Sequence, residues 1–286
     1  MKTHSIGGQT HRRGPAGRRG WTTAAGALGL GLGLGVVVAL AGCSASSGPA
    51  EPVASSSTAT ATATAATAAG AAPAACAAAV ASDWVNVPGI DPDGPPASAA
   101  GLAAWAARLE PQVTTLRAGV PAVLTSQVDA LAAAVRGAKD GKPVSTEDAS
   151  LGAALTAVNG WAHDSCGYTT LDVTNSDGSA LSGVPATLPA GPVAMKFTNT
   201  GTDPTKAGFI LLLGKVRDGQ TATAADVKSR KVNLEDVADI VAVAQPTGSG
   251  PAYGLATLRP GRYIVSTPVG PPPRFTTILA SGFKVS

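Results

Sequence analysis

Tyr253-Gly254-Leu255-Ala256-Thr257-Leu258 and Tyr263-Ile264-Val265-Ser266-Thr267 flank the turn residues Arg259-Pro260-Gly261-Arg262. Short apolar runs rich in aromatic and β-branched residues, bounded by proline and glycine, are typical of β-strands. Similar runs occur after Gly167, and a helical interruption is expected over 224–240. Six or seven short strands in about 120 residues predict an antiparallel β-sandwich. The further runs are 169–174, 194–199, 209–213 and 276–285.

The segment between Cys76 and Cys166 has helical spacing instead, because its apolar residues recur three or four positions apart. Three helices are expected, with a shorter one over 77–85, and Gly101, Pro111 and Gly119 predict kinks or breaks. The fold class is therefore α+β, a small helical bundle followed by the sandwich. The apolar positions are Leu102, Trp105, Ala106, Leu109, Val113 and Leu116, then Leu124, Val128, Leu131 and Val135, then Leu151, Leu155 and Val158.

The amino-terminal segment has the pattern of an export signal, with basic residues followed by an apolar run over 23–40. It closes with Leu40-Ala41-Gly42-Cys43, which resembles the lipobox of bacterial lipoproteins. The resemblance implies cleavage before Cys43 and fatty acylation (palmitate) of its thiol and of the new amino terminus. An uncleaved membrane anchor is the alternative, since the apolar run could marginally span a bilayer. Arg18-Arg19-Gly20-Trp21 loosely resembles a twin-arginine signal, and ordinary secretion also uses basic starts.

Two or three fatty chains would hold the protein durably on a membrane. We therefore expect a location on the outer face of the cell membrane. Residues 44–75 are Ser, Thr, Ala, Gly and Pro with one charge, Glu51. Such a composition cannot bury enough apolar surface to offset the entropy of ordering it, so 43–75 is predicted to be a disordered tether.

The charge balance argues against a nucleic-acid partner. The chain has 21 Lys and Arg against 18 Asp and Glu. Five of the basic residues and none of the acidic ones precede Cys43, which leaves 16 against 18 after cleavage. With few aromatic residues and no basic excess, we expect no nucleic-acid binding.

Cys76 and Cys166 remain once Cys43 is assigned to lipid. Outside the cytoplasm disulfides persist, so we expect these two cysteines to pair, with two free thiols as the alternative. A bond closing a loop of about ninety residues would stabilise the fold by roughly 4 to 5 kcal/mol.

Four motifs of the carboxy-terminal half occur in the order found in a known fold family. They are Leu188-Pro189-Ala190-Gly191-Pro192-Val193, Phe197-Thr198-Asn199-Thr200-Gly201, Leu258-Arg259-Pro260-Gly261-Arg262-Tyr263 and Gly282-Phe283-Lys284-Val285. Together they resemble the cupredoxin-like domains of bacterial secreted lipoproteins, and the high Ala and Gly content resembles the actinobacterial type. The resemblance implies a cupredoxin-like sandwich over 168–286, after a signal peptide at 1–42, the tether at 43–75 and a helical domain at 76–167.

The blue-copper members of that family bind the metal through two His, one Cys and a weak axial Met. The resemblance places these ligands near Lys206, Ser266, Arg274 and Leu279, none of which is such a ligand. There is no His or Cys after Cys166 and no Met after Met195. We therefore expect the sandwich to have lost copper and to carry no cofactor and no metal.

Other chemistry has weak support in the sequence. His163-Asp164-Ser165-Cys166 could form a metal or nucleophile cluster, but His163 at a helix end and Cys166 in a disulfide is the simpler interpretation. Glu235, Asp236 and Asp239 are expected to be a solvated face beside a helix start rather than acid–base catalysts. No catalytic residues are assigned, and we expect no enzyme.

The expected function is that of a membrane-anchored envelope lipoprotein that binds a protein, glycan or lipid partner. The alternatives are a solute-binding lipoprotein and a metal-handling protein. Solute binding would need a pocket where helices meet sheet, around Trp84, Trp105 and Trp161. The purely structural interpretation of Trp84 and Trp105, which we favour, is that they anchor the proline-rich loop at 86–97 by burying their rings.

Overall fold

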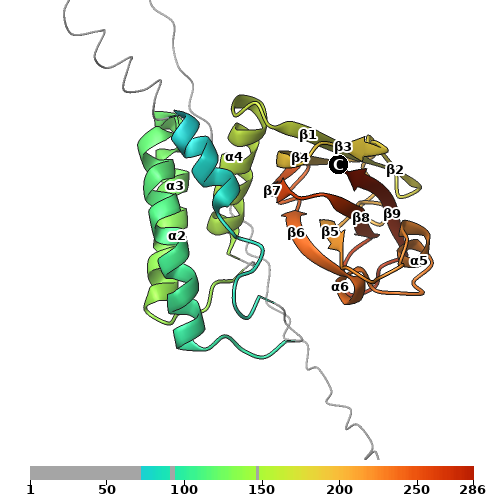
Figure 1. The fold of residues 1–286 in the computed structure, drawn as a ribbon, viewed down its shortest axis with the longest axis horizontal. Helices are drawn as coiled ribbons and strands as arrows, with labels where there is room; N and C mark the ends of the chain where they lie inside the picture. The colour runs from blue at the N-terminus through green and yellow to red at the C-terminus, as the bar shows by residue number, and fades with distance from the viewer. Residues whose placement is uncertain (1–71, 91–93, 146–147) are drawn as a thin grey trace, which may run out of the picture. The chain divides into compact units, whose positions relative to one another are not determined.

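Helices precede two β-sheets in the computed structural model, which describes residues 72–90, 94–145 and 148–286 (Figure 1). The lipobox with Cys43, and the tether apart from residues 72–75, lie outside these ranges. The α+β class expected from the sequence is confirmed. No helix of the described ranges is long and apolar enough to cross a membrane.

The helical part comprises a helix at residues 72–81 (cyan in Figure 1), α2 (Ala99–Gly119), the 3-10 turn η1 (Ala122–Leu124), α3 (Thr125–Lys139) and α4 (Ala149–Ser165). The side chain of Ser98 accepts a hydrogen bond from the Gly101 N–H and caps α2. Asp148 caps α4 in the same way. Carboxylates and hydroxyls at these positions satisfy backbone N–H groups that the helix itself leaves unpaired.

The apolar spacing correctly predicts which helix face is buried. All of the expected core positions are buried except Leu124 and Leu155, which are partly exposed. The helix does not break at Gly101 or Pro111, because α2 continues through both, and it ends at Gly119 as expected. Tertiary packing of Leu109 and Val113 on either side of Pro111 outweighs the lost backbone hydrogen bond.

Two sheets follow. The first has the order β2-β1-β4-β7 and the second β3-β9-β8-β5-β6. Their strands are β1 (Thr169–Ser176), β2 (Ala180–Ser182), β3 (Thr187–Leu188), β4 (Gly191–Thr200), β5 (Leu211–Val216), β6 (Ala238–Ala244), β7 (Ala252–Leu258), β8 (Gly261–Val269) and β9 (Thr277–Val285).

One core joins the two sheets, because alternate side chains of both point into it. From the first sheet these include Val173, Met195 and Phe197, and from the second Leu213 and Val265. Such packing of two inner faces defines a β-sandwich. The strand interpretation of all six sequence runs is confirmed, apart from shifts of a few residues at the ends.

The expected antiparallel arrangement is only partly correct, since the sheets are mixed. β1 pairs with β4 in parallel, and β3 pairs with β9 in parallel. After β2 the chain crosses to the second sheet, forms β3, and returns to run beside β1 in the same direction. Parallel neighbours require such a crossover, and residue alternation alone does not reveal it.

The expected helical interruption at 224–240 is also partly wrong. It consists of α5 (Ala224–Lys228) and α6 (Leu234–Val237), and β6 begins at Ala238. The two short helices cover the outer face of the second sheet, where Val227 and Leu234 pack with Ile264. β8 is therefore buried on both faces.

The step from β7 to β8 carries the chain from one sheet to the other over Arg259 and Pro260. The Tyr263 hydroxyl donates to the Arg259 carbonyl oxygen (2.9 Å) and accepts from the Arg259 N–H (3.0 Å). Its ring stacks on Phe283, with ring centroids 5.4 Å apart. The Tyr263 side chain thus fixes the turn between β7 and β8.

Helix α4 packs against β4 and β7 of the first sheet. A Cβ atom at Gly160 would lie 3.2 Å from the Tyr253 ring, so glycine allows this close approach. The Asn159 amide donates to the Tyr253 carbonyl oxygen (3.3 Å). Leu255 of β7 packs on the helical core, so α4 joins the helices to the sandwich.

Candidate functional site

Several places in the described chain gather functional groups or a cavity, and three of them concern residues singled out from the sequence. They are the end of the sandwich where copper ligands were looked for, the His163 junction between α4 and β1, and a cavity beside the Cys76–Cys166 bond.

At the first place, the loop before β5 meets the loop between β8 and β9. The Gly270 N–H donates to the Ala207 carbonyl oxygen (2.8 Å), and the Phe209 N–H donates to Pro268 (2.9 Å). Both loops therefore lie at the same end of the sandwich.

The four residues singled out there do not form one cluster of side chains. Ser266 and Leu279 are buried neighbours, and the Ser266 hydroxyl donates to the Leu279 carbonyl oxygen (3.2 Å). Lys206 is exposed and pairs with Asp177 (3.0 Å). Arg274 is exposed in the turn that begins at Pro271.

The interior of this end is formed by different residues. Val265 lies in the core between the sheets and Ile264 under the short helices, so strand alternation places Ser266 with Ile264 and Thr267 with Val265. Thr267 is fully buried. A Cβ atom at Gly208 would lie 2.6 Å from both Phe197 Cζ and Thr267 Oγ1. A side chain at residue 208 therefore has no room.

Two asparagines tie this end together. Buried Asn175 donates to the Asn199 side-chain oxygen (2.8 Å) and to the Lys206 carbonyl oxygen (2.9 Å), and it accepts from the Gly178 N–H (3.0 Å). Asn199 in turn holds both backbone groups of Gly208. The sequence analysis missed Asn175. Its only signal was a polar residue within a strand, and its partners become visible only with the β1–β4 register.

Within the described ranges, no group of three or more His, Cys, Asp or Glu residues could hold a metal ion. Of the three acidic residues near α6, only Asp239 has its carboxylate paired with Arg217. Arg217 pairs with Asp239 (2.7 Å) and donates to the carbonyl oxygens of Asp236 (2.9 Å) and Glu235 (3.0 Å). Arg217 thereby caps the carboxyl end of α6.

His163 occupies the second place, at the last turn of α4. Its Nδ1 lies 2.7 Å from an Asp164 oxygen and its Nε2 lies 2.9 Å from an Asp172 oxygen of β1. Its side chain is 10% exposed and its ring lies beside that of Tyr253, with centroids 5.5 Å apart. Carboxylates only accept, so both ring nitrogens donate when both bonds form, and the ring is then an imidazolium.

Burial lowers the pKa of His163, but the hydrogen bonds to Asp172 and Asp164, with their negative charges, outweigh this effect. The pKa is therefore raised above its ordinary value. Lys196 is the cation that the strand register places beside this contact. It stands opposite Asp172 of β1 on one side and opposite Tyr253 of β7 on the other. His163 therefore links helix α4 to strand β1, and protonation of its ring strengthens this contact.

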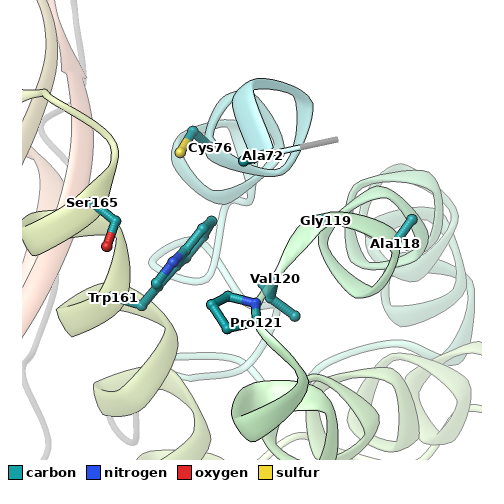
Figure 2. Close-up of a pocket in the computed structure, with 8 residues that line it drawn as sticks. All are labelled: Ala72, Cys76, Ala118, Gly119, Val120, Pro121, Trp161 and Ser165. Carbon is teal, nitrogen blue, oxygen red and sulfur yellow. The ribbon is translucent and has the colours of Figure 1, made fainter. Parts of the chain in front are cut away.

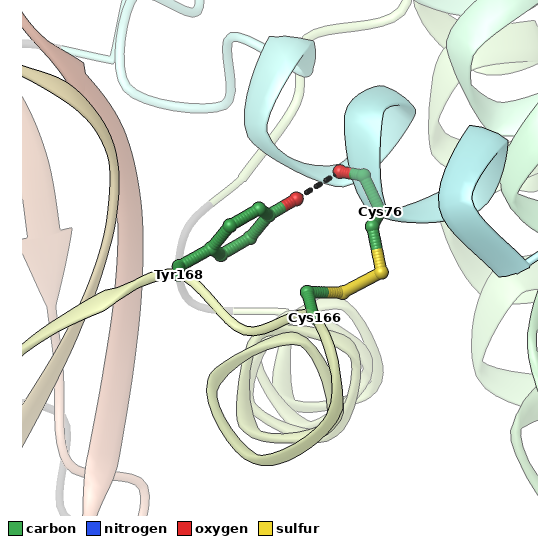
Figure 3. Close-up of a disulfide and its surroundings, with 3 residues drawn as sticks. All are labelled: Cys76, Cys166 and Tyr168. Atoms are coloured by element: carbon green, nitrogen blue, oxygen red, sulfur yellow. Dashed lines mark hydrogen bonds between the residues drawn. A yellow bond between two sulfur atoms is a disulfide. The ribbon is translucent and has the colours of Figure 1, made fainter.

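The third place lies around the expected disulfide, which is present. Cys76 and Cys166 are bonded with their Cα atoms 5.6 Å apart, closing a separation of 90 residues (Figure 3). The Tyr168 hydroxyl donates to the Cys76 carbonyl oxygen, and burial raises the pKa of Tyr168. The helix at 72–81 is thus fastened to the end of α4 by one covalent bond and one hydrogen bond.

A cavity of about 280 Å³ opens beside this bond, between the helix at 72–81, the α2–η1 connection and α4 (Figure 2). Trp161 forms one wall and Val120 and Pro121 face it. The expected pocket of three tryptophans is not found. Trp105 is fully buried, donates to the Asp83 carbonyl oxygen (3.1 Å) and meets Trp84 edge to face. These two rings fit the anchoring interpretation.

Comparison with known proteins gives little further information. No protein-family model and no curated protein matches the chain. Among solved structures, the chain is similar to an azurin, Az-iso2 from the obligate methylotroph Methylomonas sp. strain J. The match covers 41% of this chain and 98% of the azurin chain, with 14% identity and a TM-score of 0.27. A similarity this low carries no inference about the site or its function.

Replacing Asn175 with Ala should destabilise the sandwich, because it removes the donor to the Asn199 side-chain oxygen and the Lys206 carbonyl oxygen and the acceptor of the Gly178 N–H. We expect a loss of about 3 kcal/mol in the free energy of unfolding, measured by urea denaturation. Asn233→Ala is the matched control, since the Asn233 side chain makes no cap hydrogen bond. Equal losses in the two variants would contradict this account of the network.

The His163 contact should make stability depend on pH. In the unfolded chain the pKa of a histidine is about 6.5, and in the folded chain that of His163 is raised. The contact therefore stabilises fully below about pH 6.5, and its contribution is lost as pH rises through the folded pKa. We expect His163→Gln to remove this dependence and to cost on the order of 1 kcal/mol at low pH.

Urea unfolding of both proteins from about pH 5 to 9 measures this difference. His4 and His11 are present in both proteins, so the difference between the two pH profiles isolates His163. Parallel profiles for wild type and His163→Gln would show that the contact carries no proton-linked stability.

Proposed function

We propose that this chain is a non-enzymatic lipoprotein, anchored through acylated Cys43 on the outer face of the cell membrane, which binds a partner in the envelope. The carboxy-terminal half is, in this proposal, a cupredoxin-like sandwich without copper ligands, and the helices before it form a small bundle. The lipobox at 40–43 supports the anchor. The envelope partner follows from the anchor's location.

The Cys76–Cys166 disulfide is the observation that carries the proposal. Disulfides persist in oxidising compartments and are rare in the cytosol. A bond that fastens the helix nearest Cys43 suits a chain exported through its amino-terminal signal. The end of the sandwich is filled by Gly208, Thr267 and the asparagine network, which supports a scaffold role for that domain.

The Trp161 cavity favours a second candidate function, a solute-binding lipoprotein. At about 280 Å³ the cavity lies near the lower end of the range for ligand pockets. It lies among the helices rather than between helices and sheet. An apolar ligand bound there would be compatible with the anchor.

Replacing Cys43 with Ala should abolish acylation and the cleavage that goes with it, so by intact mass the variant should keep residues 1–42 and carry no acyl group. The mass of the wild-type protein should include the added acyl groups on residue 43. The double variant Cys76→Ser, Cys166→Ser is the matched control, and it should still be cleaved and acylated. Wild-type protein that carries no acyl mass, or Cys43→Ala protein that is cleaved and acylated like the wild type, would overturn the proposal.

A further inference from the structure

The cavity beside Trp161 has an apolar lining with two polar groups. Ala118, Val120 and Pro121 contribute apolar walls, and the Cys76 side chain is part of the disulfide. Figure 2 shows Trp161 and Ser165 on the same side of the cavity, both from α4. None of the residues lining the cavity is charged.

The two polar groups are available to a ligand. Neither the indole N–H of Trp161 nor the hydroxyl of Ser165 makes a side-chain hydrogen bond to any residue of 72–90, 94–145 or 148–286. Both can donate to an acceptor, while the walls suit a hydrocarbon. This combination fits a molecule with an apolar chain and a carbonyl oxygen, as in an acyl ester.

The cavity lies where the chain leads toward Cys43. Ala72, the first residue that the structure describes, lines the cavity, and Cys43 is 29 positions before it. Even fully extended, a chain of this length keeps Ala72 within about 100 Å of Cys43. If Cys43 is held in a bilayer, this end of the helices is the part of the described chain tied most closely to the lipid surface.

The surface around the cavity is uncharged as well. Residues 118–124 contain no ionisable side chain, and the turn η1 exposes Val123. With 78% of its surface accessible, Val123 is the one large hydrophobic residue of the described ranges that is strongly exposed. Arg117, the nearest cation in sequence, is paired with Asp129 (2.6 Å). This turn can therefore approach a lipid surface without the cost of desolvating an unpaired charge.

We propose that this end of the helices rests on the membrane and that an acyl chain of a bilayer lipid enters the Trp161 cavity, with its ester carbonyl accepting from Trp161 and Ser165. The inference rests on the proposed function and names lipid as the envelope partner. Tryptophan favours the boundary between hydrocarbon and water, because its ring is apolar and its N–H is polar.

Quenching of Trp161 fluorescence by brominated acyl chains tests this directly. The acylated protein is reconstituted in phosphatidylcholine vesicles with brominated or ordinary chains, and the Trp161 emission is taken as the difference from Trp161→Phe. We expect brominated lipid to remove most of this emission. The emission of the Trp161→Phe variant should change little, because Trp105 is fully buried and Trp84 packs against it.

Filling the cavity provides the control. Ala118→Phe adds a ring at an exposed position that lines the cavity, and it should restore the Trp161 emission in brominated vesicles. Ala133→Phe adds the same ring at an exposed position of α3, away from the cavity, and should leave the quenching unchanged.

Brominated stearic acid added to ordinary vesicles distinguishes the source of the chain. Quenching in this arm alone would mean that the cavity takes a free fatty acid, and it would overturn the inference. So would acylated, vesicle-bound protein whose Trp161 is not quenched, as when the chain preceding Ala72 fills the cavity. Protein that lacks acyl groups and does not bind vesicles would instead contradict the proposed function, so the two failures are distinguishable.

Discussion

The covalent bond between Cys76 and Cys166 is the constraint on which the amino-terminal part of this structure depends. The helix at 72–81 is composed of alanine apart from Pro73, Cys76 and Val80, and its buried residues are Ala75, Ala78 and Ala79. Each alanine buries little apolar surface, so packing alone holds such a helix weakly. A cross-link closing 90 residues supplies roughly 4 to 5 kcal/mol in the chain-entropy model. The bond therefore fixes the position of this helix against α4, and Cys76 lines the cavity.

The sandwich is held by a different principle, since its stability comes from one core shared by two sheets. Tyr263 fixes the corner between the two sheets through its hydrogen bonds to Arg259. The asparagine network provides hydrogen-bond partners for backbone groups near Gly208. Buried polar groups are costly unless each has a partner, so such a network also fixes a single arrangement of the loops. In this protein the end of the sandwich is occupied by packing and hydrogen bonds, and the cavity lies among the helices.

The sequence predicted best those features that depend on local pattern. Spacing of apolar residues located the buried faces of α2, α3 and α4, and counting cysteines correctly paired Cys76 with Cys166. The sequence did not predict features that depend on pairing between segments distant in the chain. The parallel pairing of β1 with β4 follows from a crossover, and β6 forms because β5 offers it an edge.

The candidate site was harder to predict for the same reason. A shift of one residue moves a strand side chain to the opposite face, so Ser266 was singled out where Thr267 lies in the interior. Trp161 lines a cavity, but this cavity lies among the helices rather than where helices meet sheet, and Trp84 and Trp105 do not line it. In the sequence all three look alike as apolar helix-face or loop residues. The double contact of His163 depends on Asp172, which only the junction of α4 with β1 brings near.

Peptide mapping of the protein purified from membranes, alkylated without reductant and analysed by mass spectrometry, tests the central claim most directly. The account predicts that the peptides containing Cys76 and Cys166 are recovered as one disulfide-linked pair, and that neither thiol is alkylated until reductant is added. Recovery of both cysteines as separately alkylated peptides would contradict it, because the helix at 72–81 would then have no cross-link to the end of α4.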